Sequence, residues 1–232
     1  MTIIGNRLTG VRHGALAQRH MSAVMELQDP TLPAAPAVLF IFSGPSGVGK
    51  DTIVEKLRKN NPANHYAITC TSRSPRPGEV DGVDYHFRTD AQFERLIASG
   101  ELLEFATVYG HYYGTPRWEI TEPLQRHQDV VIKLDVQGVA SIKAEIPDAV
   151  SIFIAPSSYT ELTHRMARRH TETGNERDVR LETAHIEMRS LETFDYVILN
   201  REGELAQTVE VAESILTAEK ARVKGRSWHV AQ

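Results

Sequence analysis

Hydrophobic residues gather along the chain in short, nearly continuous runs, at about 38–43, 130–135, 149–154 and 195–199. A strand that is apolar at successive positions is typical of a parallel sheet whose two faces are both covered by helices. Segments with helical periodicity lie between these runs. The alternation predicts an α/β fold in which helices flank a mostly parallel sheet.

The first apolar run leads into a glycine-rich segment, Gly44-Pro45-Ser46-Gly47-Val48-Gly49-Lys50, and a helical pattern follows from Thr52. A G-x-x-x-x-G-K segment between a strand and a helix is the context of a phosphate-binding loop. The glycines allow several backbone N–H groups to converge on one anion, while Lys50 can reach the outer phosphates. The sequence therefore predicts a P-loop at the end of the first strand.

One position departs from this pattern. Asp51 stands where a Ser or Thr hydroxyl usually meets Mg²⁺, and Thr52 follows it. A carboxylate is a legitimate Mg²⁺ ligand, but it also adds negative charge beside the phosphates. Two interpretations stay open: Asp51 holds the metal, or Asp51 only complements the helix dipole while Thr52 or water holds it.

Two segments interrupt the alternation and are expected to form flaps on the P-loop body. The first, about 66–115, contains short strand-like pieces and a helix at 90–99 that opens with a Thr89-x-x-Gln92 capping box. The second, about 157–182, opens with Ser158-x-x-Glu161 and is rich in arginine. Neither segment has the pattern of a domain with its own core.

Composition narrows the classes of function. The 232 residues suit one domain, and a net charge of −4 implies no bulk attraction for nucleic acid or an anionic membrane. Cys70 is the only cysteine, which excludes an intramolecular disulfide and a cysteine zinc site. The longest apolar runs are far shorter than the roughly 20 residues of a membrane span. We expect a cytoplasmic protein with neither nucleic acid nor membrane as partner.

The first 36 residues differ from the rest, since they carry several arginines, no acidic residue through Met25, and a proline-rich end. Without an apolar central region, a secretory signal is not predicted. A mobile extension, a start codon placed too early (with Met21 or Met25 as the true start), and an organellar transit peptide all stay open.

Three groups of polar residues are candidates for chemistry. Arg73 and Arg76, in a stretch stiffened by prolines, form a possible phosphate clamp, because each guanidinium can grip phosphate oxygens with paired hydrogen bonds. Glu104 alternates with apolar neighbours, and an inward carboxylate could accept from the N1–H and N2–H₂ edge of guanine. The alternatives are a solvated loop and a half-exposed strand.

The third group is arginines of the second flap. Arg165 and Arg169 lie four residues apart on one helix face, and Arg180 follows on the next predicted helix. Arginines that converge on one site could stabilise a phosphoryl group in transfer. A solvated, charged helix is the alternative.

From about Val38 to Lys220 the chain resembles guanylate kinase, the ATP-dependent GMP kinase among P-loop nucleoside-monophosphate kinases. The resemblance rests on the P-loop and on four further motifs: Thr71-Ser72-Arg73-Ser74-Pro75-Arg76-Pro77-Gly78-Glu79-Val80-Asp81-Gly82-Val83-Asp84-Tyr85, Gly110-His111-Tyr112-Tyr113-Gly114-Thr115, Leu134-Asp135-Val136-Gln137-Gly138 and Ile152-Phe153-Ile154-Ala155-Pro156-Ser157. Many NTPases share the P-loop, whereas the Arg73–Tyr85 block and the Tyr-Tyr-Gly motif are much more specific.

The resemblance implies MgATP as co-substrate, GMP or dGMP as acceptor, and the following roles. Catalysis is expected from Lys50, Arg165, Arg169 and Arg180. ATP binding is expected from Gly44, Ser46, Gly47, Val48, Gly49, Lys50, Asp51, Thr52 and Asn200, with Asp51 and Thr52 toward Mg²⁺. GMP binding is expected from Thr69, Arg73, Arg76, Tyr85, Glu104, Tyr113, Thr115 and Asp135.

The implied organisation is a P-loop parallel sheet flanked by helices, with a small mixed α/β GMP-binding insertion and a helical lid. Its boundaries are an extension at 1–36 and a kinase domain at 37–224, with a core at about 37–65, 122–156 and 183–224, a GMP-binding region at about 66–121 and a lid at about 157–182. Monomer and homo-oligomer both stay open.

Two departures bear on this expectation. Lys133 stands where the family usually has an acidic residue, and it shares a strand face with Asp135, so it could pair with Asp135, approach the phosphates, or extend past the strand edge. We hypothesise that Asp51 and Lys133 together exchange charge around the metal. Arg201 replaces the usual acidic residue after Asn200. The remaining alternatives are a non-catalytic phosphopeptide-binding module, a sugar-phosphate kinase, and a nucleotide-binding protein without a metal site.

Overall fold

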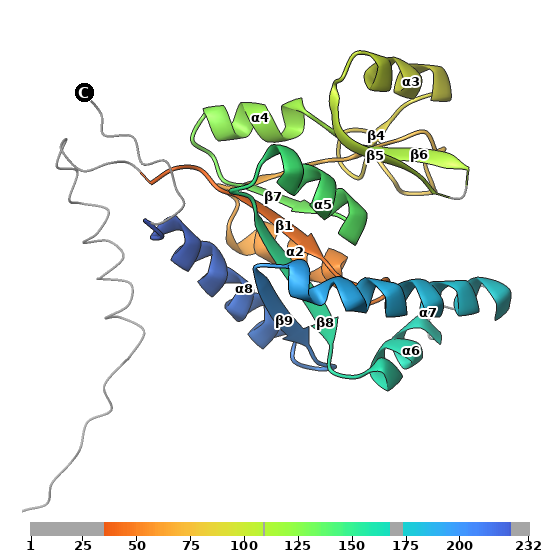
Figure 1. The fold of residues 1–232 in the computed structure, drawn as a ribbon, viewed down its shortest axis with the longest axis vertical. Helices are drawn as coiled ribbons and strands as arrows, with labels where there is room; N and C mark the ends of the chain where they lie inside the picture. Colours follow the sequence, from red (N-terminus) through yellow and green to blue (C-terminus); the bar gives the residue numbers. More distant parts are fainter. Residues whose placement is uncertain (1–34, 109, 168–173, 224–232) are drawn as a thin grey trace, which may run out of the picture. The chain divides into compact units, whose positions relative to one another are not determined.

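The computed structural model describes residues 35–108, 110–167 and 174–223, with the side chains of 166–181 left out (Figure 1). The expected N-terminal extension falls almost wholly outside this part of the chain. The described residues belong to one compact unit. None of the helices in the described residues has the length and apolar composition that a membrane span requires.

The elements alternate in the order that the hydrophobic pattern predicted. They are β1 (Leu39–Ser43), α2 (Lys50–Asn60), β2 (His65–Tyr66), β3 (Cys70–Thr71), β4 (His86–Phe87), α3 (Asp90–Ala98), β5 (Leu102–Val108), β6 (His111–Pro116), α4 (Trp118–Gln125), β7 (Val130–Lys133), α5 (Val136–Glu145), β8 (Val150–Pro156), α6 (Tyr159–Ala167), α7 (Gly174–Arg189), the 3₁₀ turn η1 (Ser190–Thr193), β9 (Tyr196–Asn200) and α8 (Leu205–Lys220).

Five strands form a parallel sheet in the order β2-β7-β1-β8-β9. All four apolar runs of the sequence are strands of this sheet, which confirms that part of the prediction. The first strand, β1, lies at the centre, so the loop that follows it emerges at the carboxyl edge of the sheet. Ligands of parallel α/β sheets gather at this edge.

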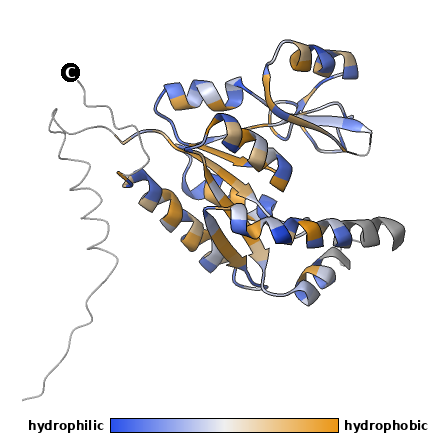
Figure 2. Cartoon of the chain, in the orientation of Figure 1, coloured by the Kyte–Doolittle hydropathy of each residue, from blue (hydrophilic) through white to orange (hydrophobic). Residues whose placement is uncertain are grey.

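The strands of this sheet are apolar on both faces because each face has its own core (Figure 2). Phe40 and Phe42 of β1 pack with residues of α2 and α8 in one cluster. Leu39 and Ile41 point the other way, into a second cluster with residues of α4 and α5. Alternation along one strand thus fills two helix–sheet interfaces.

The first interrupting segment forms a separate mixed sheet in the order β4-β3-β6-β5. Helix α3 packs on it, and its predicted capping box is present: Gln92 N–H donates to Thr89 Oγ1 and Thr89 N–H donates to Gln92 Oε1. Phe93 of α3 is fully buried, with Cys70 and Leu102, in a third small core, so this segment has a core that its sequence pattern did not predict.

A β-bulge in β5 connects this small core to the larger one. The pairing with β6 shifts between Leu102 and Glu104, so the two adjacent leucines are both buried, although strict alternation would expose one of them. Leu102 packs in the third core, while Leu103 packs under the parallel sheet with Leu39 and Ile41. The bulge also sets which way Glu104 points.

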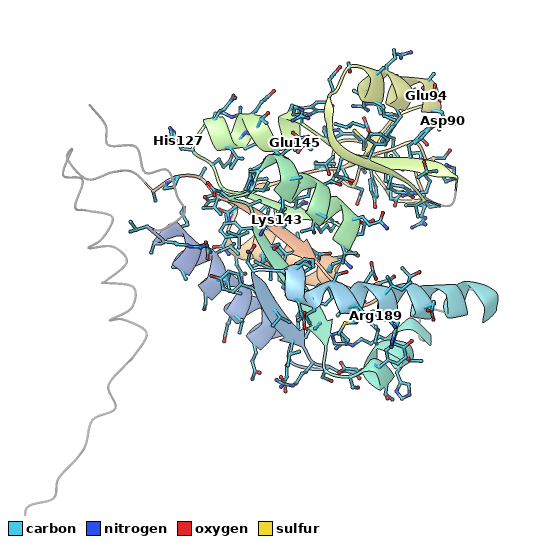
Figure 3. The ribbon with its side chains drawn as sticks, in the orientation of Figure 1. Asp90, Glu94, His127, Lys143, Glu145 and Arg189 are labelled. Carbon is cyan, nitrogen blue, oxygen red and sulfur yellow. The ribbon has the colours of Figure 1, made fainter. Side chains whose placement is uncertain are left out.

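Ion pairs fix α5 on the parallel sheet. Lys143 Nζ donates to Asp195 Oδ2 at 2.6 Å, and Asp195 accepts from the N–H and hydroxyl of Ser151 in β8. At the other side of the helix, Glu145 forms a paired contact with Arg117, just before α4 (Lys143 and Glu145 are labelled in Figure 3). These contacts hold the helix whose N-cap residue, Asp135, lines the site described below.

A nearly buried carboxylate links the two sheets. Glu119 of α4 is 2.7 Å from Nε2 of His65 in β2 and 2.7 Å from Nε2 of His86 in β4, and it accepts from the N–H of Ile68. Burial opposes its charge, yet the hydrogen bonds from the two histidines and Ile68 hold the pKa of Glu119 at about 2. The negative charge of Glu119 is therefore part of the folded state.

We predict that Glu119 makes the protein acid-sensitive. A carboxyl whose pKa falls from 4.5 to about 2 on folding stabilises the fold above pH 4.5, and this contribution, on the order of 3 kcal/mol, is lost as the pH falls toward 2. Glu119→Gln should remove that loss, and should lower stability at pH 7. Denaturant unfolding between pH 7 and pH 3 measures both, with the exposed Glu122→Gln of the same helix as control. An unchanged acid dependence in Glu119→Gln would contradict the assignment.

Candidate active site

The predicted P-loop joins β1 to α2 at the carboxyl edge of the parallel sheet. All three of its glycines have positive φ angles, 137° at Gly44, 81° at Gly47 and 100° at Gly49, which is the region that side chains disfavour. The turn closes with a 3.2 Å hydrogen bond from Val48 N–H to the Pro45 carbonyl. Helix α2 begins at Lys50, so the loop ends at a helix N-terminus, as an anion site requires.

Gly44 is required by space as well as by conformation. A Cβ atom built there would lie 2.1 Å from the carbonyl oxygen of Ile154 in β8, a backbone atom that cannot move aside. The loop therefore passes directly over the neighbouring strand. This contact explains why the loop starts with glycine in this chain.

Lys50 folds back over the loop. Its ammonium donates to the carbonyl oxygens of Gly44 and Pro45, the latter at 3.1 Å. Burial lowers the pKa of Lys50, and the negative charges of Glu187, Asp51 and Asp135 oppose that shift. Lys50 thus lies among three carboxylates that come from different elements.

A pocket of about 280 Å³ opens in front of Lys50 and extends to the mixed sheet. Five of the eight residues predicted to bind GMP line this pocket, together with Lys50, Asp51 and Lys133. Those five are Thr69, Tyr85, Glu104, Tyr113 and Asp135. Residues predicted from separate motifs are therefore brought together in one cavity that also reaches the P-loop.

One end of this pocket has carboxylate acceptors. Glu104 Oε1 accepts a 2.6 Å hydrogen bond from the hydroxyl of Thr115, which is fully buried. Burial raises the pKa of Glu104, the Thr115 hydroxyl partly counters that, and the charge of Asp135 adds to the increase. Asp135 caps α5 by accepting from Gly138 N–H at 2.7 Å. Two carboxylates and a hydroxyl held this way present acceptors to a ligand edge that carries N–H donors.

The predicted phosphate clamp is partly assembled. The guanidinium of Arg73 lies 5.4 Å from the centre of the Tyr85 ring. The carboxylate of Glu79 accepts a hydrogen bond from each terminal nitrogen of the same guanidinium, both at 2.9 Å, and these bonds raise the pKa of Arg73. In this structure a carboxylate of the chain thus takes the paired hydrogen bonds that a phosphate could take.

Arg76 lines a second pocket of about 440 Å³ that shares Asp51, Thr69, Tyr85 and Lys133 with the first. The Arg76 N–H donates to Glu79 at 2.7 Å. The two predicted clamp arginines therefore meet at one carboxylate, but only Arg76 lines one of these two pockets.

Lys133 pairs with Asp51, whereas the shared strand face had favoured Asp135 as one possible partner. The ammonium of Lys133 donates to Asp51 Oδ1, which connects the end of β7 to the first turn of α2. Both side chains line both pockets, and both are about half exposed or more. Thr52, the other predicted metal contact, is exposed in α2 and does not line either pocket.

Arg165 and Asn200 hold the back of the P-loop. The carbonyl oxygen of Val48 accepts from Arg165 at 3.0 Å and from the buried amide of Asn200 at 2.7 Å. Arg165 also donates to the carbonyl of Asn200 at 2.8 Å and to Glu161. Of the other predicted lid arginines, Arg169 lies outside the described residues, and the side chain of Arg180, in α7, is likewise not described.

Two glutamates that sequence reasoning did not single out act on these groups, one through hydrogen bonds and one through its charge. Glu79 binds Arg73, and its place three residues after Arg76 in the same motif was an available signal. Glu187 lies near Lys50 but is 137 positions further along the chain, so no local pattern connects the two. Only the fold brings α7 to the P-loop.

The fold and the pocket define a class of protein: a P-loop nucleotide-binding α/β protein with an acceptor cavity facing the loop lysine. Comparisons with known proteins narrow this class. The family model for guanylate kinase matches residues 37–219. A crystal structure of guanylate kinase from Anaplasma phagocytophilum superimposes with a TM-score of 0.68 at 30% identity, over 83% of this chain and 90% of that one.

Curated relatives are closer in sequence. "Guanylate kinase" of Carboxydothermus hydrogenoformans is 42% identical over 193 residues, 83% of this chain and 94% of the relative. "Guanylate kinase 2, chloroplastic/mitochondrial" of Oryza sativa subsp. japonica is 40% identical over 203 residues, 87% of this chain and 71% of the relative. This chain belongs to the guanylate kinase family.

We predict that Gly44→Ala disrupts the site through the backbone of β8. The added methyl would overlap the Ile154 carbonyl, so the free energy of unfolding should fall by several kcal/mol, on the order of 4. Gly203→Ala is the matched control, because Gly203 also has a positive φ, 81°, but open space around its Cβ position; it should cost about 1 kcal/mol. Equal losses in denaturant unfolding would show that conformation alone, and not the close approach, requires Gly44.

Proposed function

We propose that this chain transfers the γ-phosphoryl group of ATP to GMP or dGMP, giving ADP and GDP or dGDP. The observation that carries the proposal is the single pocket in which Lys50 of the P-loop faces Glu104, Tyr85 and Tyr113 of the mixed sheet. A phosphate donor bound at the loop and an acceptor bound at the sheet would meet inside it. Family membership supports the same reaction.

The acceptor side supplies base selectivity. Glu104, held by Thr115, and Asp135, held at the start of α5, are proposed to accept the N1–H and N2–H₂ donors of guanine. Thr69 lines the same pocket and is proposed to contact the base. Adenine offers no such donor pair, so AMP would leave buried acceptors without partners.

The acceptor phosphate is proposed to bind among Arg73, Arg76, Tyr85 and Tyr113. It would take over the paired hydrogen bonds that Glu79 now makes with Arg73. An exchange of one anion for another keeps the guanidinium satisfied before and after binding. The clamp then fixes the attacking oxygen relative to the donor phosphates, and such positioning supplies much of the catalysis in phosphoryl transfer.

The donor side is the P-loop, with Arg165, Arg169 and Arg180 proposed as lid arginines and Asn200 on the adenosine side. The donor set fits Mg²⁺ carried by ATP, because one carboxylate, Asp51, at the head of an open pocket is what this ion accepts beside phosphates and water. When bound, Mg²⁺ would neutralise phosphate charge. Asp51 is proposed as its protein ligand, with Thr52 as the alternative.

The setting is proposed to be the cytoplasm, which agrees with a single, buried, free cysteine at position 70. The proposed partners are the two nucleotides, without nucleic acid or membrane. The proposal assumes the predicted domain organisation, which has a core, a GMP-binding region at about 66–121 and a lid at about 157–182. A phosphopeptide-binding module is not favoured, since Lys50 and the acceptor pocket are both assembled.

We predict strict acceptor selectivity. In an ADP-release assay with MgATP, GMP and dGMP should support turnover, while AMP should be rejected by a factor on the order of 10⁴. Glu104→Gln should raise the KM for GMP and reduce the selectivity factor for GMP over AMP, because an amide can donate a hydrogen bond where the carboxylate only accepts one. Lys50→Met serves as the inactive reference.

Glu101→Gln is the matched control for Glu104→Gln, since Glu101 is an exposed carboxylate just before the same strand. Turnover with AMP as fast as with GMP, or an unchanged KM in Glu104→Gln, would contradict the assignment of the base site.

A further prediction concerns Asp51 and Lys133. If Asp51 holds the metal, Asp51→Asn should reduce the gain in ATP affinity that Mg²⁺ provides by about tenfold. Titration calorimetry of ATP with and without Mg²⁺ measures this gain without any turnover. Glu55→Gln, one turn along the same helix and paired with Lys59 on the surface, is the control.

Lys133→Asp tests the other half of the pair. The new carboxylate beside Asp51 should change the Mg²⁺ dependence of ATP binding, because two negative charges would then face the phosphates. If Asp51→Asn and Lys133→Asp both leave the Mg²⁺ dependence unchanged, the charge-exchange hypothesis is wrong.

A further inference from the structure

The carboxylate of Glu79 occupies the arginine that is proposed to bind the acceptor phosphate. Its two oxygens accept from the two terminal nitrogens of Arg73, both at 2.9 Å, and the side chains of Arg73 and Glu79 are only 12% and 19% exposed. Two parallel hydrogen bonds to a largely buried guanidinium are also the way in which arginine binds a phosphate. The chain therefore supplies an anion of its own to this part of the clamp.

A tight turn presents this carboxylate to Arg73. Pro77 and Gly78 are the central residues of the turn, which closes when the Glu79 N–H donates to the Arg76 carbonyl at 3.0 Å. Gly78 has the positive φ, 89°, that a type II turn requires at its third residue. The side chain then folds back and accepts from the Arg76 N–H at 2.7 Å. The place of Glu79 beside Arg73 is thus set by local sequence.

The carboxylate satisfies the guanidinium of Arg73 only in part. The Nε atom of Arg73 is buried and has no hydrogen-bond partner among the described residues. A guanidinium carries five N–H donors, and Glu79 binds at the terminal nitrogens alone. A phosphate monoester brings three terminal oxygens and about two negative charges at neutral pH, so it can satisfy more of these donors than a carboxylate can.

We propose that Glu79 is an internal competitor of the acceptor phosphate: it binds Arg73 and the Arg76 N–H in the ligand-free protein, the phosphate of the nucleotide displaces it, and Glu79 thereby lowers the affinity of the site for phosphate monoesters. This inference rests on the proposed binding of the GMP phosphate at Arg73, and it adds what sets the strength of that binding. The hydrogen bonds from Arg73 and from the Arg76 N–H lower the pKa of Glu79, so the competitor is charged at neutral pH.

Displacement of Glu79 would release both clamp arginines. One oxygen, Oε2, accepts from the side chain of Arg73 and from the N–H of Arg76. A carboxylate and a phosphate repel at contact distance and cannot share the same donors, so a phosphate that takes Arg73 drives Glu79 away. The turn that carries Arg76 then loses its connection to Arg73. Arg76, which lines the second pocket and not the first, would be free to turn toward the phosphate.

The displaced carboxylate has a place to go. Glu79 already lines the second pocket of about 440 Å³, which the positively charged side chains of Arg58 and Lys133 also line. A rotation of the Glu79 side chain keeps it near these cations, so displacement does not leave a carboxylate without positive charge nearby. We therefore expect Glu79 to weaken phosphate binding moderately and not to prevent it.

The same competition would act on the product. GDP keeps, next to its ribose, the phosphate that GMP brought into the clamp. Glu79 would return to Arg73 when this phosphate leaves, so it would favour the release of GDP as well as weaken the binding of GMP.

The test compares Glu79→Gln with the wild type by titration calorimetry on the full chain. The ligands are GMP, ribose 5-phosphate, which is a phosphate monoester without a base, and guanosine, which lacks the phosphate. MgADP is present throughout, so that the P-loop is occupied. Glutamine keeps the size and one acceptor for the Arg76 N–H but removes the competing charge. We expect GMP and ribose 5-phosphate to bind about tenfold more tightly to Glu79→Gln, with the Kd for guanosine unchanged.

Two further variants accompany it. Asp84→Asn removes a carboxylate from the same segment, whose Oδ2 atom accepts from the Val80 N–H at 2.8 Å and which also lines the second pocket. It should leave all three constants unchanged. Glu79→Ala should also tighten the binding of ribose 5-phosphate, which keeps the test available if the glutamine variant folds poorly. Thermal unfolding of each variant without ligand identifies a loss of fold.

Weaker or unchanged binding of both phosphates in the Glu79 variants would overturn the proposal, because Glu79 would then support Arg73 and not compete for it. An equal gain with guanosine, or in Asp84→Asn, would overturn it too. None of these constants depends on turnover. A protein that shows the expected differences but does not phosphorylate GMP would contradict the proposed function alone, and if GMP does not bind, ribose 5-phosphate still decides the inference.

Discussion

The carbonyl oxygen of Val48 is the point at which the nucleotide-binding loop is held in shape. A loop whose N–H groups converge on an anion must turn carbonyl groups outward, and a carbonyl that is turned into the protein needs donors. Arg165 and Asn200 supply them, and Asn200 in turn accepts from Thr208 of α8. Residues of β9, α6 and α8 thus all support the loop through the Val48 carbonyl oxygen. The absence of a side chain at Gly44 lets the loop lie against β8.

The part of the pocket proposed to bind GMP depends on a different constraint. The small mixed sheet must be fixed next to the larger parallel sheet. The bulge at Leu102 and Leu103 sends neighbouring side chains into two cores, and Glu119 bridges a histidine from each sheet. Because of these links Glu104 faces the end of β7 and the start of α5. The pocket is therefore a consequence of how the two sheets are joined.

Much of the fold was predictable because the signals are local. Every strand of the parallel sheet except the two-residue β2 is a continuous apolar run, and the helix at 90–99 begins at its predicted capping box. Five of the eight residues predicted to bind GMP also line one cavity, while their roles stay predictions. The spacing of residues within a motif indicates which side chains lie together in the fold.

The rest could not be predicted, because it depends on contacts between distant segments. The bulge in β5 breaks the alternation on which the prediction of that strand relied. Lys133 finds Asp51, which is 82 positions away, and not the residue two positions along its own strand. The charge of Glu187 acts on Lys50, which is 137 positions away in the sequence. Buried charge also has no sequence pattern of its own, so Glu187 was missed.

The central claim is that one pocket joins a phosphate donor at the P-loop to a guanine nucleotide at the mixed sheet. Direct transfer of label tests it: ATP labelled in the γ-phosphate is incubated with the protein, Mg²⁺ and GMP, and the products are separated. The account predicts that the label appears in the β-phosphate of GDP, with little free phosphate, since transfer in a closed site excludes water. Label released only as inorganic phosphate, at a rate that GMP does not change, would contradict it.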